Sequence, residues 1–148
     1  MSDSNKKQFL GRWKLECCVG KSGDKRFHPI GEDPFGMLTY TAQYMMVFIS
    51  SGQRARFSTD DIRAIPAEQV MADFPKFETY CGQYGIDDDK KIVTHFIENG
   101  KIPNQIGTEF RRYFSFQNEK LVLESTDELM LNGEPWLFEL VWSKQESL

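Results

Sequence analysis

The sequence has few of the residues that build metal sites and disulfide frameworks. Its two histidines, His28 and His95, have no partner at the spacing of metal ligands. It has three cysteines and no Cys-x-x-Cys pair, which argues against both a disulfide framework and a cysteine zinc site. No nucleotide-binding loop or nucleophile elbow is present either. We therefore expect free cysteines in a reducing compartment, no bound metal and no cofactor.

Charge of one sign and long apolar runs are also scarce. Eighteen Lys and Arg residues stand against 22 Asp and Glu residues, a net charge of -4, whereas nucleic-acid binding needs a basic patch. No stretch approaches the roughly 18 consecutive apolar residues of a membrane span. Residues 1–7, Met-Ser-Asp-Ser-Asn-Lys-Lys, lack the apolar run of a secretory signal. We expect a cytoplasmic protein without a nucleic-acid or membrane partner, and with residues 1–7 disordered.

Aromatic residues, by contrast, are plentiful. Phe, Tyr and Trp make up 14% of the chain, and such residues favour strands and line small-molecule pockets. In the stretch 107–116 every second residue shares one face, which carries Phe110, Arg112, Phe114 and Phe116. Because an unpaired buried charge is costly, Arg112 should be paired, stacked or in contact with a ligand.

The same alternation recurs between turn signals along the whole chain. Strands are predicted at residues 9–19, 26–30, 37–41, 44–49, 80–86, 91–98, 107–116, 120–125 and 136–142. In the first of these, every second residue is expected to face inward, namely Trp13, Leu15, Cys17 and Val19. A short helical insertion is predicted near residues 59–74. Residues 58–61 resemble a helix start, and Pro66 would occupy the first turn of a second short helix that ends before Pro75.

This pattern predicts an all-β fold in a single domain over residues 1–148. We expect an antiparallel up-and-down β-barrel of about eight to ten strands, because closure removes exposed sheet edges. A barrel of this size encloses packed side chains or one small ligand. A two-sheet sandwich is the alternative. The barrel is favoured because so many inward positions are aromatic or polar.

Seven segments, in order along the chain, carry a resemblance to a known family. Gly11-Arg-Trp13 is similar to the Gly-x-Trp opening of lipocalins and the wider calycin group; the others are residues 31–41, 80–84, 93–95, 103–107, 112–114 and 121–123. Together they resemble the bacterial and fungal lipocalin-like domain family. The resemblance implies a barrel with a central cavity and supplies no catalytic signature. Secreted lipocalins have a signal peptide and usually disulfides, and this chain shows neither.

The resemblance also bears on Gly11, Trp13 and Arg112. It implies that Gly11 and Trp13 form the structural end of the barrel, where an Arg from a late strand commonly lies across the Trp. Arg112 could fill that position as a cation–π lid. The other interpretation is that Arg112 anchors a ligand carboxylate or other anion.

Binding of a small, largely hydrophobic ligand in the barrel cavity is the leading functional hypothesis, and the ligand's identity stays open. The candidate ligand-binding residues are inward aromatic and polar side chains: Tyr40, Tyr80, Tyr84, His95, Arg112, Phe114, Trp136 and Phe138. Each has a structural alternative. His95 would be a neutral core histidine that is hydrogen-bonded to a tyrosine or a water. The tyrosines would line the interior with their hydroxyl groups hydrogen-bonded, and the aromatic residues of the last strand, Trp136, Phe138 and Trp142, would be part of the core.

Two further hypotheses compete with ligand binding. The first is a cofactor-free enzyme of the isomerase, cyclase or hydratase type, with His95 as acid or base and a tyrosine orienting the intermediate. The second is an interaction role for the outer surface, where Met46, Phe48 and Phe96 would form the interface of a homodimer. The segment 59–74 is either a lid over the barrel mouth or a static plug.

Overall fold

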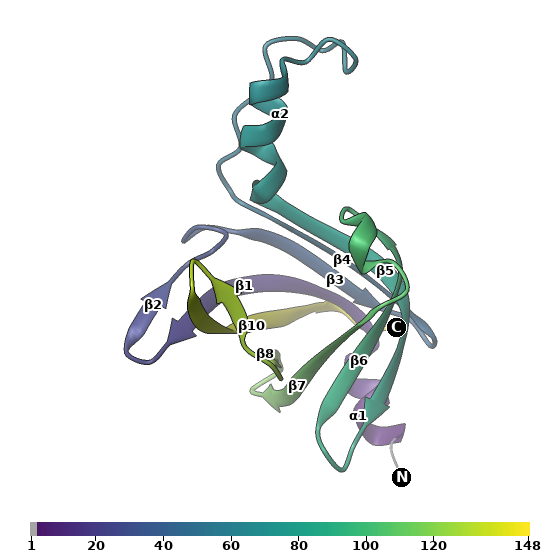
Figure 1. Ribbon diagram of the computed structural model, residues 1–148. Helices are drawn as coiled ribbons and strands as arrows, with labels where there is room; N and C mark the ends of the chain where they lie inside the picture. The colour runs from purple at the N-terminus through teal and green to yellow at the C-terminus, as the bar shows by residue number, and fades with distance from the viewer. Residues whose placement is uncertain (1–2) are drawn as a thin grey trace.

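The computed structural model describes residues 3–148, most of which form one antiparallel sheet closed into a barrel (Figure 1). Its strands are β1 (Gly11–Ser22), β2 (Lys25–Phe27), β3 (Phe35–Tyr40), β4 (Tyr44–Ser50), β5 (Phe77–Asp87), β6 (Ile92–Gly100), β7 (Glu109–Gln117), β8 (Lys120–Ser125), β9 (Leu129–Leu131) and β10 (Glu134–Glu146). The sheet order is β2-β1-β3-β4-β5-β6-β7-β8-β10-β9, and β1 also pairs with β10. This pairing closes eight strands into a ring and leaves β2 and β9 as short additions.

The predicted barrel is therefore confirmed, and its register explains where the core lies. Trp13 of β1 pairs with Leu38 of β3, and Leu15 of β1 pairs with Trp142 of β10. All four side chains are at most 2% exposed, because the alternation of each strand points them inward. Ring closure leaves no central strand with an unpaired edge, so the apolar interior is covered on all sides by hydrogen-bonded backbone.

One part of the predicted inward pattern in β1 is wrong. A register shift lies between Leu15, which pairs with Trp142, and Cys17, which pairs with Val141. A bulge of this kind adds one residue to a strand and moves every later side chain to the opposite face. Cys18 is consequently buried at 5% exposure, whereas Cys17 and Val19 are only partly buried. The bulge requires no particular residue type, so alternation alone could not locate it.

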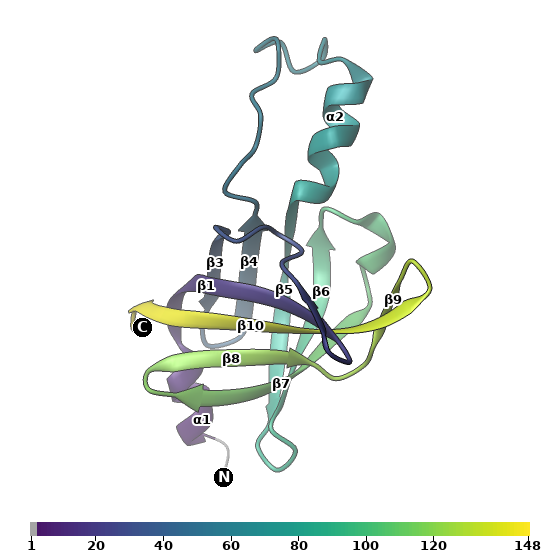
Figure 2. The ribbon, with the colours of Figure 1, turned by 90° about the vertical axis from the view of Figure 1, so that its left-hand side faces the viewer.

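A short helix, α1 (Asp3–Phe9), precedes β1 and lies at one end of the barrel (Figure 2). The expected disorder of residues 1–7 is therefore wrong for residues 3–7, and residues 1–2 lie outside the described part of the chain. Phe9 ends the helix and is 0% exposed. Its ring contacts three others edge-on, with centroids 5.0–5.1 Å apart: Tyr40, Phe114 and Phe116. Phe9 thus plugs this end of the barrel.

Residues 51–76 form an arm between β4 and β5 that carries α2 (Ala67–Asp73) and the 3₁₀ turn η1 (Phe74–Lys76). In Figures 1 and 2 the arm stands away from the barrel, at the end opposite α1. The predicted helical insertion is confirmed: α2 begins directly after Pro66 and ends before Pro75, as expected for the second short helix. The helix start predicted at residues 58–61 is wrong, because these residues form bends and irregular backbone. No helix within residues 3–148 is long and apolar enough to cross a membrane.

Side chains, rather than core packing, hold the arm, since no residue of α2 is buried. Arg54 donates two hydrogen bonds to the Asp73 carboxylate, at 2.8 and 2.6 Å. The Lys101 side chain, which is 6% exposed, donates to the carbonyl oxygens of Phe74 and Phe77. Its Nζ also lies 4.2 and 4.5 Å from the ring centres of those two residues. Lys101 therefore joins the base of the arm to the barrel.

Replacing Lys101 with methionine is expected to loosen the arm, because the two carbonyl oxygens then lose a buried charged donor. We expect a loss of about 2 kcal/mol in the free energy of unfolding, measured with urea, and faster tryptic cleavage within residues 51–76. Lys25→Met is the matched control, since Lys25 pairs with Glu134 on the surface and its side chain is 63% exposed. Equal cleavage rates in the two variants would contradict this role for Lys101.

Candidate functional site

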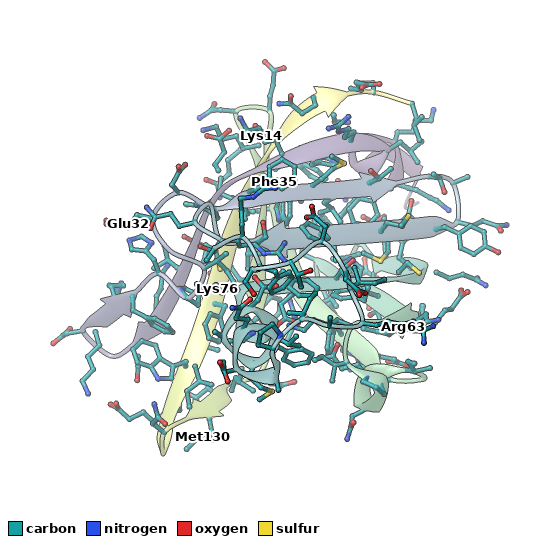
Figure 3. The ribbon with its side chains drawn as sticks, turned by 90° about the horizontal axis from the view of Figure 1, so that it is seen from above. Lys14, Glu32, Phe35, Arg63, Lys76 and Met130 are labelled. Atoms are coloured by element: carbon teal, nitrogen blue, oxygen red, sulfur yellow. The ribbon has the colours of Figure 1, made fainter. Side chains whose placement is uncertain are left out.

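The inner wall of the barrel changes character between its two ends. Near α1 the inward residues are buried; Tyr40 is 0% and Phe114 is 5% exposed, and both pack on Phe9. At the other end, called the arm end below, inward residues are only partly buried, namely Tyr80, Phe110, Arg112 and Phe138. Figure 3 views the molecule from above, with Lys76 at the base of the arm and Met130 in the β9–β10 hairpin. Solvent therefore reaches the inner wall from the arm end.

A tyrosine–histidine–tyrosine cluster, made of Tyr40, His95 and Tyr80, lies on this wall. His95 comes from β6 and is 2% exposed. The Tyr40 hydroxyl oxygen is 2.6 Å from His95 Nε2, and the Tyr80 hydroxyl oxygen is 2.8 Å from His95 Nδ1. Strands β3, β5 and β6 each contribute one side chain, so residues far apart in the sequence meet at a single polar point in an apolar interior.

All three side chains of the cluster are neutral near pH 7. Burial, and secondarily the positive charge of Arg112, lower the pKa of His95 from 6.5 to about 3. Burial raises the pKa of Tyr80 to about 12 and raises the pKa of Tyr40 well above its usual 10. The cluster therefore offers hydrogen bonds to a partner without a charge of its own.

Counting hydrogen atoms shows which hydroxyl is left to donate. A neutral imidazole has one N–H and one acceptor nitrogen, so one tyrosine donates to the ring and the other accepts from it. The tyrosine that accepts keeps its own O–H for a further partner. If that were Tyr40, a fully buried hydrogen would lack an acceptor among the described residues, at a cost of about 1–3 kcal/mol. The favoured arrangement has the hydrogen on Nδ1 of His95 and leaves the O–H of Tyr80 free.

Arg112 lies beside this cluster. Its guanidinium carbon is 5.2 Å from the centre of the Phe110 ring, and the Tyr80 ring packs edge-on against that same ring, also at 5.2 Å. Arg112 donates to the carbonyl oxygen of its neighbour Arg111 at 2.8 Å and makes no ion pair with any described side chain. The arrangement therefore places an uncompensated positive charge near the free hydroxyl of Tyr80.

The cation that covers Trp13 is Lys144 and not Arg112, which the sequence suggested. Lys144 Nζ, rather than Arg112, lies 4.6 Å from the Trp13 ring centre and donates to the carbonyl oxygens of Gln8 and Leu10. Burial lowers the pKa of Lys144. The alternation that places Trp136, Phe138, Leu140 and Trp142 inward continues to position 144. Extending the last predicted strand by two residues, from 142 to 144, would have identified Lys144 as an inward residue.

Gly11 begins β1 at a position where any other residue would be strained. Its φ is +128°, and a Cβ at this position would lie 2.0 Å from the carbonyl oxygen of Glu146. Two residues later, the Trp13 indole N–H donates to the Phe9 carbonyl oxygen at 2.8 Å. Gly11 and Trp13 thus join the first strand to the last strand and to α1 at the closed end.

A family comparison agrees with this geometry. A model of the family described as "Lipocalin-like domain" matches residues 10–145, from the start of β1 almost to the end of β10. The chain belongs to the lipocalin-like domain family. A lipocalin-like barrel suggests small-molecule binding in general and specifies no ligand. The curated proteins and the solved structures compared with the chain gave no match.

Within the described part of the chain, the other candidates make no hydrogen bond to the Tyr80 hydroxyl, although the Tyr84 ring packs edge-on against Tyr40 at 4.7 Å. Tyr84 donates its hydroxyl to the Thr41 carbonyl oxygen at 2.7 Å, and Phe114 packs on Phe9 at the α1 end. Trp136 and Phe138 pack around Phe27 of β2, with ring centroids 4.7 and 6.2 Å from it. Among the described residues, no ring contact joins this β10 pair to His95.

The outer surface of the lipocalin-like barrel carries other features. Met46 and Phe96 are 63% and 41% exposed, whereas Phe48 stacks on Phe77 at 6.0 Å. A depression of about 320 Å³ on the outside of β8 and β10 is lined by Gln117, Asn118, Lys120, Val122, Glu124, Glu139 and Val141. Another, of about 90 Å³, lies between the arm's coil and α2. Within the described chain, no three His, Cys, Asp or Glu residues gather as metal ligands would.

Proposed function

We propose that this lipocalin-like barrel binds one small, largely apolar molecule, which enters from the arm end and meets the cluster of Tyr40, His95 and Tyr80. The observation that carries the proposal is the cluster itself, a neutral polar point on an aromatic inner wall that solvent reaches. Ligand pockets typically combine a mostly apolar lining with a few placed polar groups. Phe110 and Phe138 would supply the apolar contact at this end.

The same geometry favours binding over catalysis by His95. Both ring nitrogens already have hydrogen-bond partners, so neither faces a substrate. A proton given up by Tyr80 and replaced through His95 would leave a phenolate on Tyr40. Burial raises the pKa of Tyr40 well above 10, which makes that phenolate unfavourable. The cluster is therefore suited to donate a hydrogen bond rather than to transfer a proton.

The cysteines support a proposed location in the cytoplasm. Cys17, Cys18 and Cys81 are all free thiols, with Cys18 buried and the other two partly buried. Free thiols persist in a reducing environment. This supports the proposal that the ligand is bound in the cytoplasm.

Titration with 1-aminoanthracene, a neutral apolar fluorophore, tests whether the interior takes a ligand. Ile49→Trp enlarges an inward side chain of β4 that packs against the core, and it is expected to weaken binding at least about tenfold through overpacking. Met46→Trp makes the corresponding change on the outer face of the same strand and should leave affinity within about twofold. Near-ultraviolet circular dichroism checks that both variants fold.

Native mass spectrometry of the protein purified from cells complements that titration. A retained small molecule, released on denaturation, is the expected result. A wild-type chain that binds no fluorophore and retains no molecule would contradict the proposed function. Equal weakening by the inner and the outer tryptophan would contradict the interior location.

A further inference from the structure

Hydrogen-bond donors lack acceptors on the described inner wall. Tyr80 has a free O–H by the hydrogen count above, and Arg112 donates only to the Arg111 carbonyl oxygen and has no ion-pair partner among the described residues. The nearby acceptors are already used. Glu78 pairs with Lys101 at 3.3 Å, and the Ser125 hydroxyl bonds to the backbone of β10. Tyr80 and Arg112 are only partly buried, so water can pair with them in the free protein, and a ligand that displaces this water has to bring an acceptor of its own.

We propose that the ligand is an apolar molecule ending in a carboxylate, which accepts the hydroxyl hydrogen of Tyr80 and lies beside the guanidinium of Arg112; this inference rests on the proposed function. Tyr80 and Arg112 contact the same Phe110 ring, and the charge of Arg112 acts on both Tyr80 and His95, which supports a shared site for one terminal group. Hydrogen bonds from a cation to a carboxylate are stronger than those between neutral groups. A neutral acceptor would leave the charge of Arg112 without a partner.

The charges around the cluster support an anionic end group. The Arg112 charge lowers the pKa of His95 and opposes the rise in the pKa of Tyr80, so its positive field reaches both side chains. His95 stays neutral and adds no competing charge. Glu78, two residues before Tyr80 on β5, has its carboxylate paired with Lys101. A carboxylate beside Tyr80 therefore meets a net positive environment.

Calorimetric titration of the full chain with three probes of equal chain length tests this inference. Octanoate has the carboxylate, methyl octanoate keeps a carbonyl acceptor without the charge, and octan-1-ol has a hydroxyl instead. At pH 7.5 we expect wild-type protein to bind octanoate about tenfold or more tightly than either neutral probe, as expected for a charge-assisted bond. Equal affinity for all three probes would overturn the inference that the ligand ends in a carboxylate, and it would leave the proposed function standing.

Three variants locate the end group. Arg112→Met and Tyr80→Phe are each expected to weaken octanoate binding about tenfold or more, with octan-1-ol binding changed by less than about twofold. Arg112→Lys should restore part of the preference. Tyr113→Phe is the matched control, because Tyr113 lies on the outer face of β7 and is 46% exposed, and it should leave both affinities unchanged. A preference for octanoate that survives both Arg112→Met and Tyr80→Phe would overturn the placement of the carboxylate beside these two residues. Failure of all three probes to bind the wild-type protein would overturn both this inference and the proposed function.

Discussion

Phe9→Ala is expected to lower the free energy of unfolding by about 3–5 kcal/mol, the usual cost of removing a fully buried phenylalanine. The Phe9 side chain is 0% exposed and its ring meets three aromatic rings edge-on at 5.0–5.1 Å. Its removal leaves a cavity at the closed end and weakens the docking of α1, which then keeps only polar contacts such as those from Trp13 and Lys144 to its backbone. Urea unfolding followed by tryptophan fluorescence measures the loss.

Phe96→Ala is the matched control for the Phe9 variant. Phe96 lies on the outer face of β6 and is 41% exposed, so the same truncation should cost less than about 1 kcal/mol. A similar small loss in Phe9→Ala would show that α1 does not plug the barrel in solution. Faster hydrogen exchange of residues 3–9 in the Phe9 variant, without a change in β6, would support the plug independently.

The barrel was predictable from the sequence because it depends on alternation, which each strand displays locally. From β3 to β8 the only register shift among the described pairs lies between Cys81 and Gly82, where β5 meets the end of β6, and the inward residues named in these strands keep their period of two. The misses have physical reasons. The polar composition of residues 1–7 hid a helix that is stabilised by Phe9 docking in a distant pocket, and the bulge at Cys17 depends on pairing with β10. Both depend on contacts between residues that lie far apart in the sequence.

The candidate site was predictable in its membership but not in its geometry. Alternation places Tyr40, Tyr80 and His95 inward, yet it cannot show that two hydroxyls reach the two nitrogens of one ring. That contact depends on the relative stagger of β3, β5 and β6, which closure of the whole barrel sets. For the same reason Lys144, from the last strand, reached Trp13 in place of Arg112.

The stability of the protein should fall steeply as the pH is lowered through the range where an unfolded histidine gains its proton. His95 has a pKa of about 3 in the folded protein and 6.5 as a free side chain, so between these values the unfolded chain binds a proton that the folded chain does not. The contribution of His95 to the free energy of unfolding is complete above about pH 6.5 and is lost progressively as the pH falls to about 3. From pH 7.5 to pH 5 the expected loss is about 2 kcal/mol.

His95→Gln isolates this contribution, because every other titrating group is common to both proteins. The variant is less stable at pH 7.5, since the two tyrosine hydroxyls lose the ring between them, but its urea midpoint should change less between pH 7.5 and pH 5. Carboxylates such as Asp73, whose pKa is lowered by Arg54, lose their stabilisation at more acidic pH and do so in both proteins. Equal pH slopes would mean that His95 takes up a proton in the folded barrel. A protonated His95 has no acceptor nitrogen, so Tyr40 could no longer donate to the ring, and the free hydroxyl assigned to Tyr80 would lose its basis.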